Sequence, residues 1–405
     1  MKLDKVYENL TVPNKTKLAL VVLDGLGDIA TDTTGWRTPL EAAKTPTLDL
    51  LAKRSAMGRM IPVAPGITPG SGPGHLGLFG YDPLEYEVGR GVIEALGLGI
   101  ELKVGDVAAR ANFCSVDAKG IVTDRRAGRI DTSVCEAQCA LLAKKIKKIG
   151  DVEVIIKAGK GHRFVVVFRG KGLEGPLTNT DPNREGLPIA VSKPVKKTAK
   201  STKAAKLVTA FYKQALPLLK NCRPANSFLL RGIAHQPAIP TFEERYGLKA
   251  AAIAVYPMYK GLAQLVGMKK IEGTNSVKDE FNAAVVALKS FDFVFIHVKY
   301  TDMYGEDGNF DGKVKAIEEA DAALSVLLPE VDVLVITGDH STPVPVKGHS
   351  WHPQPVMITG EIAGWDGLER FTERAANSGS LGIFEAKYLI RLMQANARRL
   401  DKFGA

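Results

Sequence analysis

The sequence predicts an α/β fold with an open, mostly parallel sheet and helices on both faces. Three short apolar stretches are rich in β-branched residues and contain an aspartate near their ends: 18–25, 292–302 and 332–340. Continuous apolar runs of this length are typical of strands buried on both faces of a parallel sheet. Amphipathic helical segments lie between such stretches or after them, as at 45–55, 313–328 and 383–400. Strands that alternate with helices favour this architecture.

The positive charge of the chain lies in one central segment. The chain has 405 residues, 45% of them hydrophobic, and a net charge of +10. Residues 111–225 contain 23 Lys and Arg against 9 Asp and Glu, so the rest of the chain is slightly acidic. This segment has its own apolar stretches and helical patterns. We therefore predict a basic α+β domain at 111–225, inserted into a core domain formed by 1–110 and 226–405.

Three explanations fit the basic segment: a nucleic-acid surface, a site for an anionic small molecule, or a solvated face. Aromatic residues are sparse in it, so base stacking is not indicated and we expect no nucleic-acid partner. No apolar run approaches the roughly 18 residues of a membrane span. The polar N-terminal residues lack the apolar part of a secretory signal, and the four cysteines fit no zinc-binding spacing. We expect a cytoplasmic monomer or homo-oligomer with reduced thiols and no membrane partner.

Acidic and imidazole side chains follow the predicted strands. The candidates are Asp24, Asp302, Asp339, His340 and, nine residues later, His349. Ligands of open α/β sheets bind beyond the carboxyl ends of the strands. A single aspartate there is often only a helix cap, but a mixed set of carboxylates and imidazoles suits Mn, Zn or a similar ion. The set is large enough for two ions, an arrangement that recurs in phosphoryl transfer.

Ser71 is the candidate nucleophile. It lies in a glycine-rich stretch, 65–83, that leads into a predicted helix. Glycines permit a tight turn, and the free N–H groups of a helix N-terminus can bind a phosphoryl group. A metal ion near the hydroxyl would activate it. The alternative is a loop without chemistry, since a glycine-rich stretch alone is weak support.

A third cluster is basic and lies at the start of the predicted insertion. Arginine binds carboxylate and phosphate in a planar, bidentate way, so several arginines suit a substrate that carries both groups. The alternative is surface ion pairing. Asp124 lies among these residues. The candidate substrate-binding residues are Arg110, Arg125, Arg126, Arg129, His162 and Arg163.

A family resemblance covers the chain from about residue 15 to its C-terminal FGA. The stretches that carry it occur in order: VVLDGLGD, TPTLDLLA, PGSGPGHLGLFGYDP, GRGVIEALG, ANFCSVD, DRRAGRI, TDPNREGLP, VYPMYKGLAQLVGM, HVKYTDMYGEDGNFDGK, TGDHSTP and HSWHPQPVMI. Together they resemble the archaeal-type, cofactor-independent phosphoglycerate mutases of the alkaline-phosphatase superfamily. The resemblance implies an alkaline-phosphatase-like core sheet with an inserted cap domain. It also implies interconversion of 2- and 3-phosphoglycerate through a phosphoserine on Ser71, without 2,3-bisphosphoglycerate.

The resemblance also implies the ligands of two divalent metal ions. One site would use Asp24, Ser71, Asp339 and His340, and the other Asp302, His349 and a third ligand. In the family the third ligand is usually a histidine four residues after the aspartate, where this chain has Glu306. We expect Glu306 to bind the ion; the alternative is that Glu306 is not a ligand and that this site is weakened. A carboxylate there makes the site harder and favours Mn or Mg over Zn, and Co remains an option.

The expected mechanism is a transfer within one bound molecule. Asp124 is the candidate general acid/base, and the basic domain would act as a lid that excludes water from the phosphoserine. Other superfamily enzymes share the metal and serine motifs, so a phosphatase, a phosphopentomutase and a nucleotide pyrophosphatase remain alternatives. So do a family member whose Glu306 has altered its activity, and a non-catalytic binder of anions or nucleic acid.

Overall fold

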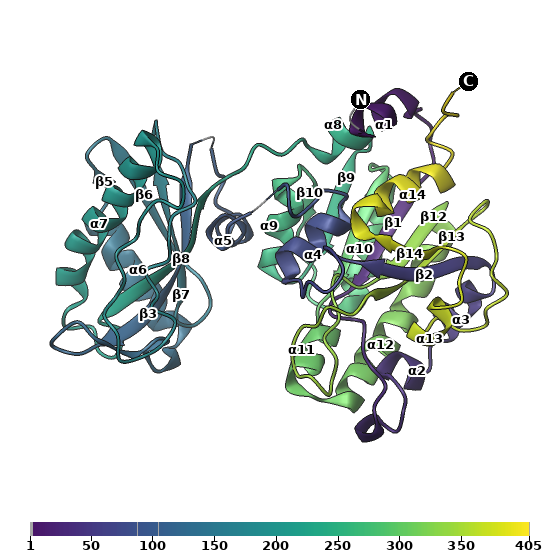
Figure 1. Ribbon diagram of the computed structural model, residues 1–405, viewed down its shortest axis with the longest axis horizontal. Coiled ribbons are helices and arrows are strands. Elements are labelled where there is room, and N and C mark those ends of the chain that lie inside the picture. The colour runs from purple at the N-terminus through teal and green to yellow at the C-terminus, as the bar shows by residue number, and fades with distance from the viewer. Residues whose placement is uncertain (1–2, 87, 104, 405) are drawn as a thin grey trace. The chain divides into compact units, whose positions relative to one another are not determined.

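The computed structural model describes residues 3–86, 88–103 and 105–404, and it divides the chain into two compact units (Figure 1). Met1–Glu87 and Ile239–Ala405 form one unit, called the core unit here. Val88–Ala238 form the other, called the inserted unit.

An eight-stranded sheet forms the centre of the core unit. All its strands run parallel except β13, which is antiparallel to both neighbours. Every residue of β1, β11 and β12 is buried, so the continuous apolar runs of the sequence are the central strands, as predicted. In spatial order the strands are β10 (Lys269–Ile271), β9 (Ala250–Ala254), β11 (Phe293–Val298), β1 (Leu18–Leu23), β12 (Val333–Thr337), β13 (Gln354–Gly360), β2 (Ser55–Ile61) and β14 (Gly382–Glu385).

Helices of the core unit bury apolar faces against this sheet. A core of Leu, Ile, Val, Ala and Phe side chains joins α10 and α12 to the central strands. The helices are α1 (Leu3–Leu10), α2 (Pro39–Ala42), α3 (Pro46–Ala52), α4 (Ser71–Leu78), α8 (Phe242–Tyr246), α9 (Pro257–Leu265), α10 (Val277–Leu288), α11 (Tyr300–Asp307), α12 (Phe310–Leu324), α13 (Glu373–Ala376) and α14 (Leu389–Asn396).

The segment 383–400 differs from its predicted single helix. Residues Gly382–Glu385 form β14, because they pair with β2 at the edge of the sheet. A short 3₁₀ turn at Ala386–Tyr388 follows, and the helix begins only at Leu389. Among the described residues, no helix is long and apolar enough to cross a membrane.

The inserted unit is an antiparallel sheet with helices and a core of its own. Its apolar core includes Phe113, Phe164, Phe211 and Phe228. The strands are β3 (Val107–Val116), β4 (Val122–Asp124), β5 (Lys148–Ile149), β6 (Val152–Ala158), β7 (Arg163–Arg169) and β8 (Ser227–His235), and the helices are α5 (Arg90–Gly97), α6 (Thr132–Lys145) and α7 (Ala199–Leu219).

The inserted unit is larger than the predicted domain at 111–225, so the predicted boundaries are wrong. A boundary at 110/111 cuts β3, which pairs with β7 and β8 from residue 107 onward. A boundary at 225/226 removes β8 from its partner. Helix α5 also belongs here, because Gly91 packs so closely on Ala108 that an added side-chain carbon would lie 2.4 Å from the Ala108 carbonyl oxygen.

Candidate active site

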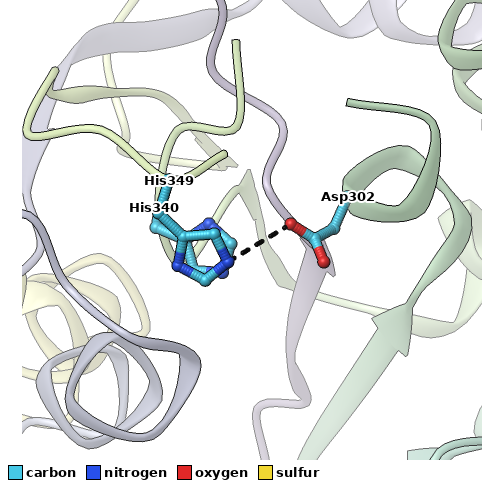
Figure 2. A group of neighbouring side chains, drawn as sticks. All are labelled: Asp302, His340 and His349. Atoms are coloured by element: carbon cyan, nitrogen blue, oxygen red, sulfur yellow. Dashed lines mark ion pairs between the residues drawn. The ribbon is translucent and has the colours of Figure 1, made fainter. Parts of the chain in front are cut away.

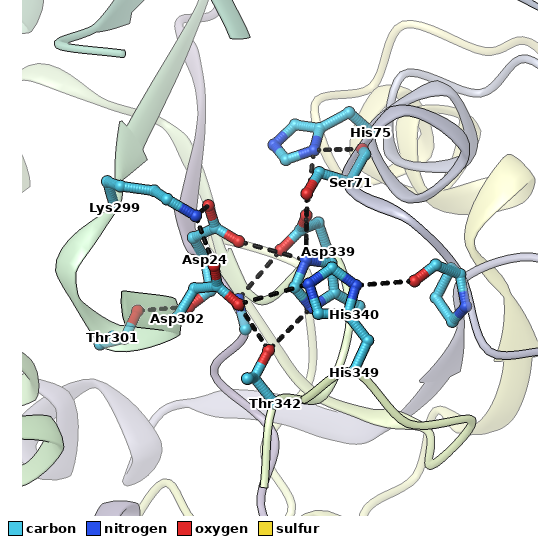
Figure 3. Close-up of polar contacts among 12 residues, drawn as sticks. Asp24, Ser71, His75, Lys299, Thr301, Asp302, Asp339, His340, Thr342 and His349 are labelled. Atoms are coloured by element: carbon cyan, nitrogen blue, oxygen red, sulfur yellow. Dashed lines mark hydrogen bonds and ion pairs between the residues drawn. The ribbon is translucent and has the colours of Figure 1, made fainter. Parts of the chain in front are cut away.

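The predicted metal ligands of the core unit meet at one edge of its sheet (Figure 3). Strands β11, β1 and β12 are neighbours and parallel, so their carboxyl ends lie side by side. Asp24 directly follows β1, and Asp302 lies in the first turn of α11, shortly after β11. Asp339 and His340 follow β12 by two and three residues. The parallel register therefore brings together side chains that are more than 300 residues apart.

These side chains form two groups that can hold a metal ion. Asp24, Asp339 and His340 offer ligand atoms that all lie within 4.8 Å of one another. Asp302, His340 and His349 form the second group under the same distance, so the two groups share His340 (Figure 2). The imidazoles of His340 and His349 stack at 3.7 Å between ring centres, which places both rings on the same side of Asp302.

The chemistry of the first group fits a divalent cation. Asp24 and Asp339 are fully buried, and Asp24 Oδ1 and Asp339 Oδ2 accept no hydrogen bond from the described residues. Both oxygens face His340 Nε2, at 3.3 and 3.2 Å. Two buried carboxylates this close are costly unless positive charge compensates them. Oxygen ligands mixed with imidazole suit Mn, Zn and similar ions.

Ser71 lies beside this group. It is the first residue of α4, after Gly70 at the N-cap, so its hydroxyl lies at the positive end of the helix. Ser71 Oγ is 3.4 Å from His340 Nε2. Helix α4 closely approaches the loop after β12, which carries Asp339 and His340. At Gly74 of this helix, an added side-chain carbon would lie 2.5 Å from the Asp339 carbonyl oxygen. The glycine-rich motif thus allows the helix to bring the hydroxyl to the carboxylates.

Buried histidine and tyrosine side chains contact the carboxylates of Asp24 and Asp339. His75 Nδ1 lies 2.9 Å from the Ser71 carbonyl oxygen and 3.2 Å from Asp339 Oδ2. His297 Nε2 lies 3.2 Å from Asp24 Oδ2, and its ring stacks on Tyr259. The Tyr259 hydroxyl donates to Asp24 Oδ2. Burial and the charge of Asp24 raise the pKa of Tyr259, so this hydroxyl keeps its proton and remains a donor.

Lys299 connects the two groups that can hold a metal ion. Its ammonium is 2.9 Å from Asp24 Oδ2 and also pairs with Asp302 Oδ2. Although burial alone would raise the pKa of Asp24, the charges of Lys299 and of the nearby histidines hold it well below its usual value. Asp24 is therefore ionised. Thr342 donates to Asp302 Oδ1 at 2.6 Å, which fixes this carboxylate from the other side.

Glu306 lies near the second group without being part of it. Its side chain is 55% exposed, and its carboxylate lies 3.8 Å from His349 Nε2. It does not belong to either three-residue group, and His340 takes its expected place beside Asp302 and His349. Glu306 lies about one helical turn after Asp302 on α11. Ligation by Glu306 stays a prediction.

The predicted basic cluster lies in the inserted unit around a tight turn. The Asp124 carboxylate accepts hydrogen bonds from the N–H groups of Arg126 and Gly128, at 2.7 and 2.6 Å. Three successive residues from Ala127 to Arg129 have φ between 48° and 64°, which is costly for the two that are not glycine. Despite partial burial, the N–H donors lower the pKa of Asp124. It is thus a charged anchor of the turn and holds no proton to donate.

Arginines on one face of the sheet surround His162. Arg110 on β3 lies opposite Arg231 on β8, and Arg163 begins β7 opposite Asn112. Partial burial and the positive charges of four arginines (Arg163, Arg126, Arg110 and Arg129) lower the pKa of His162 to about 4. Arg110 Nε is buried without a hydrogen-bond acceptor among the described residues, and its carboxylate neighbour Glu94 is 3.8 Å away. This face can bind an anion strongly.

Arg125 differs from the other predicted arginines because a buried aspartate already binds it. Asp181 accepts hydrogen bonds from Arg125 Nε and Nη2, at 2.9 and 3.0 Å, and it forms an ion pair with Arg231, whose Nε lies 2.6 Å from Asp181 Oδ2. Asp181 is 4% exposed, so this ion pair is a fixed part of the unit. Arg125 therefore stabilises the loop, and Arg231 is a residue of the basic face that the sequence prediction missed.

Comparison with known proteins identifies the family. Residues 52–226 match the family model described as 2,3-bisphosphoglycerate-independent phosphoglycerate mutase. A Thermotoga neapolitana protein, named a probable 2,3-bisphosphoglycerate-independent phosphoglycerate mutase, is 49% identical over 402 residues, which cover 99% of each chain. The chain belongs to the family of 2,3-bisphosphoglycerate-independent phosphoglycerate mutases. A Thermus thermophilus relative of the same name is 47% identical over the full length of both chains.

Two solved structures also resemble this mutase-family chain. The cofactor-independent phosphoglycerate mutase of Thermoplasma acidophilum has a TM-score of 0.74 and 31% identity, over 94% of this chain and 99% of that one. A Pyrococcus horikoshii protein has a TM-score of 0.82 and 33% identity, over 97% of this chain and all of that one. Both likenesses span the core and inserted units, so the mutase-family fold covers the whole chain.

Several residues beside the two carboxylate–histidine groups were not among the site residues predicted from the sequence. His75 had a readable signal, because it lies one helical turn after Ser71 in the glycine-rich motif. His297 and Tyr259 had none, since each lies in an apolar stretch and reads as core. Lys299 lies three residues before Asp302, but only the fold shows that it reaches Asp24 as well.

Proposed function

We propose that this chain interconverts 2-phosphoglycerate and 3-phosphoglycerate through a phosphoserine on Ser71, with divalent metal ions and without 2,3-bisphosphoglycerate. The observation that supports this most directly is the hydroxyl of Ser71 at the N-terminus of α4, 3.4 Å from an imidazole shared by two carboxylate–histidine groups. Family membership adds to it, because relatives that cover the whole chain are named for this reaction.

The residues of the core unit would carry out the transfer. Asp24, Asp339 and His340 would hold one ion, with Ser71 beside it, and Asp302 and His349 would hold a second; Mn²⁺ is the favoured ion, with Mg²⁺, Zn²⁺ and Co²⁺ as alternatives. Bound ions would lower the pKa of the serine hydroxyl and offset negative charge on the phosphoryl oxygens. Ser71 Oγ loses its proton and attacks phosphorus, the bond from phosphorus to the glycerate oxygen breaks, and that oxygen takes up a proton. The other glycerate hydroxyl then loses its proton and attacks the phosphoserine, the bond from phosphorus to Ser71 Oγ breaks, and Ser71 takes up a proton again.

The arginine face of the inserted unit would bind the anionic groups of the substrate. Among the described residues, no carboxylate lies within hydrogen-bond distance of the guanidinium groups of Arg110 and Arg163, so an incoming carboxylate or phosphate would find donors there. Glycerate must stay bound between the two half-reactions, and water must not reach the phosphoserine. Glycerate still carries its carboxylate after it has lost the phosphoryl group, so a face with several arginines would retain it. The general acid/base role of Asp124 remains a proposal, and its lowered pKa limits it to accepting a proton.

Product analysis tests this function. The purified chain, stripped of metal by a chelator, is mixed with 2-phosphoglycerate and Mn²⁺, Mg²⁺, Zn²⁺ or Co²⁺ in the absence of 2,3-bisphosphoglycerate. We expect 3-phosphoglycerate to form only with an added ion, and little inorganic phosphate to appear. Release of phosphate without isomerised product would instead identify a phosphatase. Full isomerisation in the metal-stripped sample would contradict the role of the two metal-binding groups.

A further inference from the structure

Lys313 is a fully buried lysine of the core unit, and it lies beside the segments that carry the predicted metal ligands. Its ammonium has 0% exposure and donates to Asp28 Oδ2 at 2.8 Å, to the Gly25 carbonyl oxygen at 2.9 Å and to the Thr342 carbonyl oxygen at 3.0 Å. A lysine has three N–H donors, so each has an acceptor. Such complete satisfaction of a buried charge fixes the ammonium in one position.

Each acceptor of Lys313 belongs to a segment that carries predicted metal ligands. Gly25 follows Asp24, and its N–H donates to Asp339 Oδ1 at 3.1 Å. Thr342 follows His340 by two residues, and its hydroxyl donates to Asp302 Oδ1. The loop after β1 and the loop after β12 therefore meet at one ammonium group.

Lys313 also connects these loops to the third ligand-bearing segment. It lies in α12, which begins three residues after the end of α11, the helix that contains Asp302. Gly305 of α11 packs so closely on the β12 loop that a side-chain carbon would lie 2.3 Å from the Thr342 carbonyl oxygen. One side chain thus bridges the segments that supply ligands to both groups.

The energetics favour a role beyond stability. Asp28 is buried as well, and its carboxylate also accepts from the Val344 N–H, at 3.0 Å to Oδ2. A buried ion pair costs much of its attraction in desolvation, and an apolar pair of similar volume often stabilises a fold as well or better. What the apolar pair lacks is the ability to hold two carbonyl oxygens at fixed positions. We infer that Lys313 is a positioning residue, which holds the Asp24 and His340 loops so that both groups bind metal ions; this inference rests on the proposed function of those groups.

The test separates positioning from charge compensation with two variants. Lys313→Met removes the ammonium and leaves Asp28 as an unpaired buried charge. Lys313→Met with Asp28→Asn removes both charges but keeps a carbonyl acceptor for the Val344 N–H. Mn²⁺ affinity is measured by titration calorimetry on the metal-stripped full chain, and Tm is measured without metal. We expect the double variant to regain most of the Tm that the single variant loses, while Mn²⁺ affinity stays about 10- to 100-fold below that of the unmodified chain, the usual effect of removing an outer partner of metal ligands.

A matched control lies on the same helix. Asp321 is also a buried carboxylate, on α12, but its hydrogen-bond donors among the described residues are the N–H groups of Thr47 and Leu48, which lie outside the loops after β1 and β12. Asp321→Asn should lower Tm and leave Mn²⁺ affinity unchanged. The inference is overturned if the double variant binds Mn²⁺ like the unmodified chain, or if Asp321→Asn weakens binding as much as Lys313→Met. If the unmodified chain itself binds no divalent ion, the proposed function fails first, which is a distinguishable result.

Discussion

His162 shows how a single residue reports on the basic face. Partial burial and four arginines lower its pKa to about 4, well below its usual value of about 6.5. Between these values the unfolded chain binds more protons than the folded chain, so His162 contributes stability above pH 6.5 that is lost as the pH falls through about 4. An anion bound among the arginines would offset their charge and favour the protonated imidazole.

We therefore expect 3-phosphoglycerate to raise the pKa of His162. The measurement is an NMR titration of the imidazole resonances with and without 3-phosphoglycerate, with His162→Gln used for assignment. Arg110→Met should reduce the increase, because it removes a buried guanidinium with no close carboxylate acceptor. Lys206→Met, an exposed lysine of α7, should not. An unchanged pKa at saturating 3-phosphoglycerate would show that the arginine face does not bind it.

Residue patterns pointed to Asp24, Asp302 and Asp339, which lie together in the structure, but not to the supporting residues around them. Asp24, Asp302 and Asp339 were predictable because each follows an apolar strand, and parallel strands bring their carboxyl ends together. Lys313 was not, because a lysine within an amphipathic helix reads as solvent-exposed. Its contacts are to Asp28, Gly25 and Thr342, all distant in sequence. No local pattern records such contacts.

At the scale of elements, helix α4 positions Ser71, the proposed nucleophile, through its glycines. Gly74 lies against the Asp339 carbonyl oxygen, so Gly74→Ala would push the helix away from the β12 loop. We expect kcat to fall at least tenfold, because Ser71 moves relative to His340 and displacements of about 1 Å cost large factors in rate. Steady-state kinetics with 2-phosphoglycerate measure this.

A glycine in open space provides the comparison. Gly348 precedes the predicted ligand His349 and has no atom close to the position of an added side-chain carbon. Gly348→Ala should leave kcat nearly unchanged. An equal loss in both variants would mean that α4 packing has no specific part in positioning Ser71.

Elements and their order were easier to predict than their boundaries. The central strands were recognisable because they are almost entirely apolar. The edge strand β14 was not, because Gly382–Glu385 is short and half exposed and precedes an amphipathic helix. The predicted boundaries of the inserted unit were wrong because they were based on charge composition, which does not follow strand pairing. Strands β3 and β8 pair although they lie more than 110 residues apart.

At the scale of the whole molecule, the two units have separate sheets and separate cores. Both predicted metal-binding groups lie in the core unit, and the arginine face lies in the inserted unit. Metal binding should therefore stabilise one unit and not the other. A ligand at 100 times its Kd adds about 2.7 kcal/mol to the stability of the structure that binds it.

We expect Mn²⁺ to raise a thermal transition of the full chain but not the Tm of residues 88–238 produced as a separate chain. That fragment contains the complete antiparallel sheet and its own core, so it should unfold cooperatively. Differential scanning calorimetry with and without Mn²⁺ measures both. If the Tm of the fragment rose with Mn²⁺ as much as that of the full chain, the metal would bind to the inserted unit, which would contradict this prediction.

The most direct test of the central claim is the detection of phosphate on Ser71. The Mn²⁺-loaded chain is mixed with 2-phosphoglycerate, quenched in acid within the first turnovers and analysed by peptide mass spectrometry. We expect a phosphorylated peptide that contains Ser71, no such peptide from Ser71→Ala, and no isomerisation by that variant. Isomerisation by Ser71→Ala in the absence of 2,3-bisphosphoglycerate would rule out transfer through a phosphoserine on Ser71.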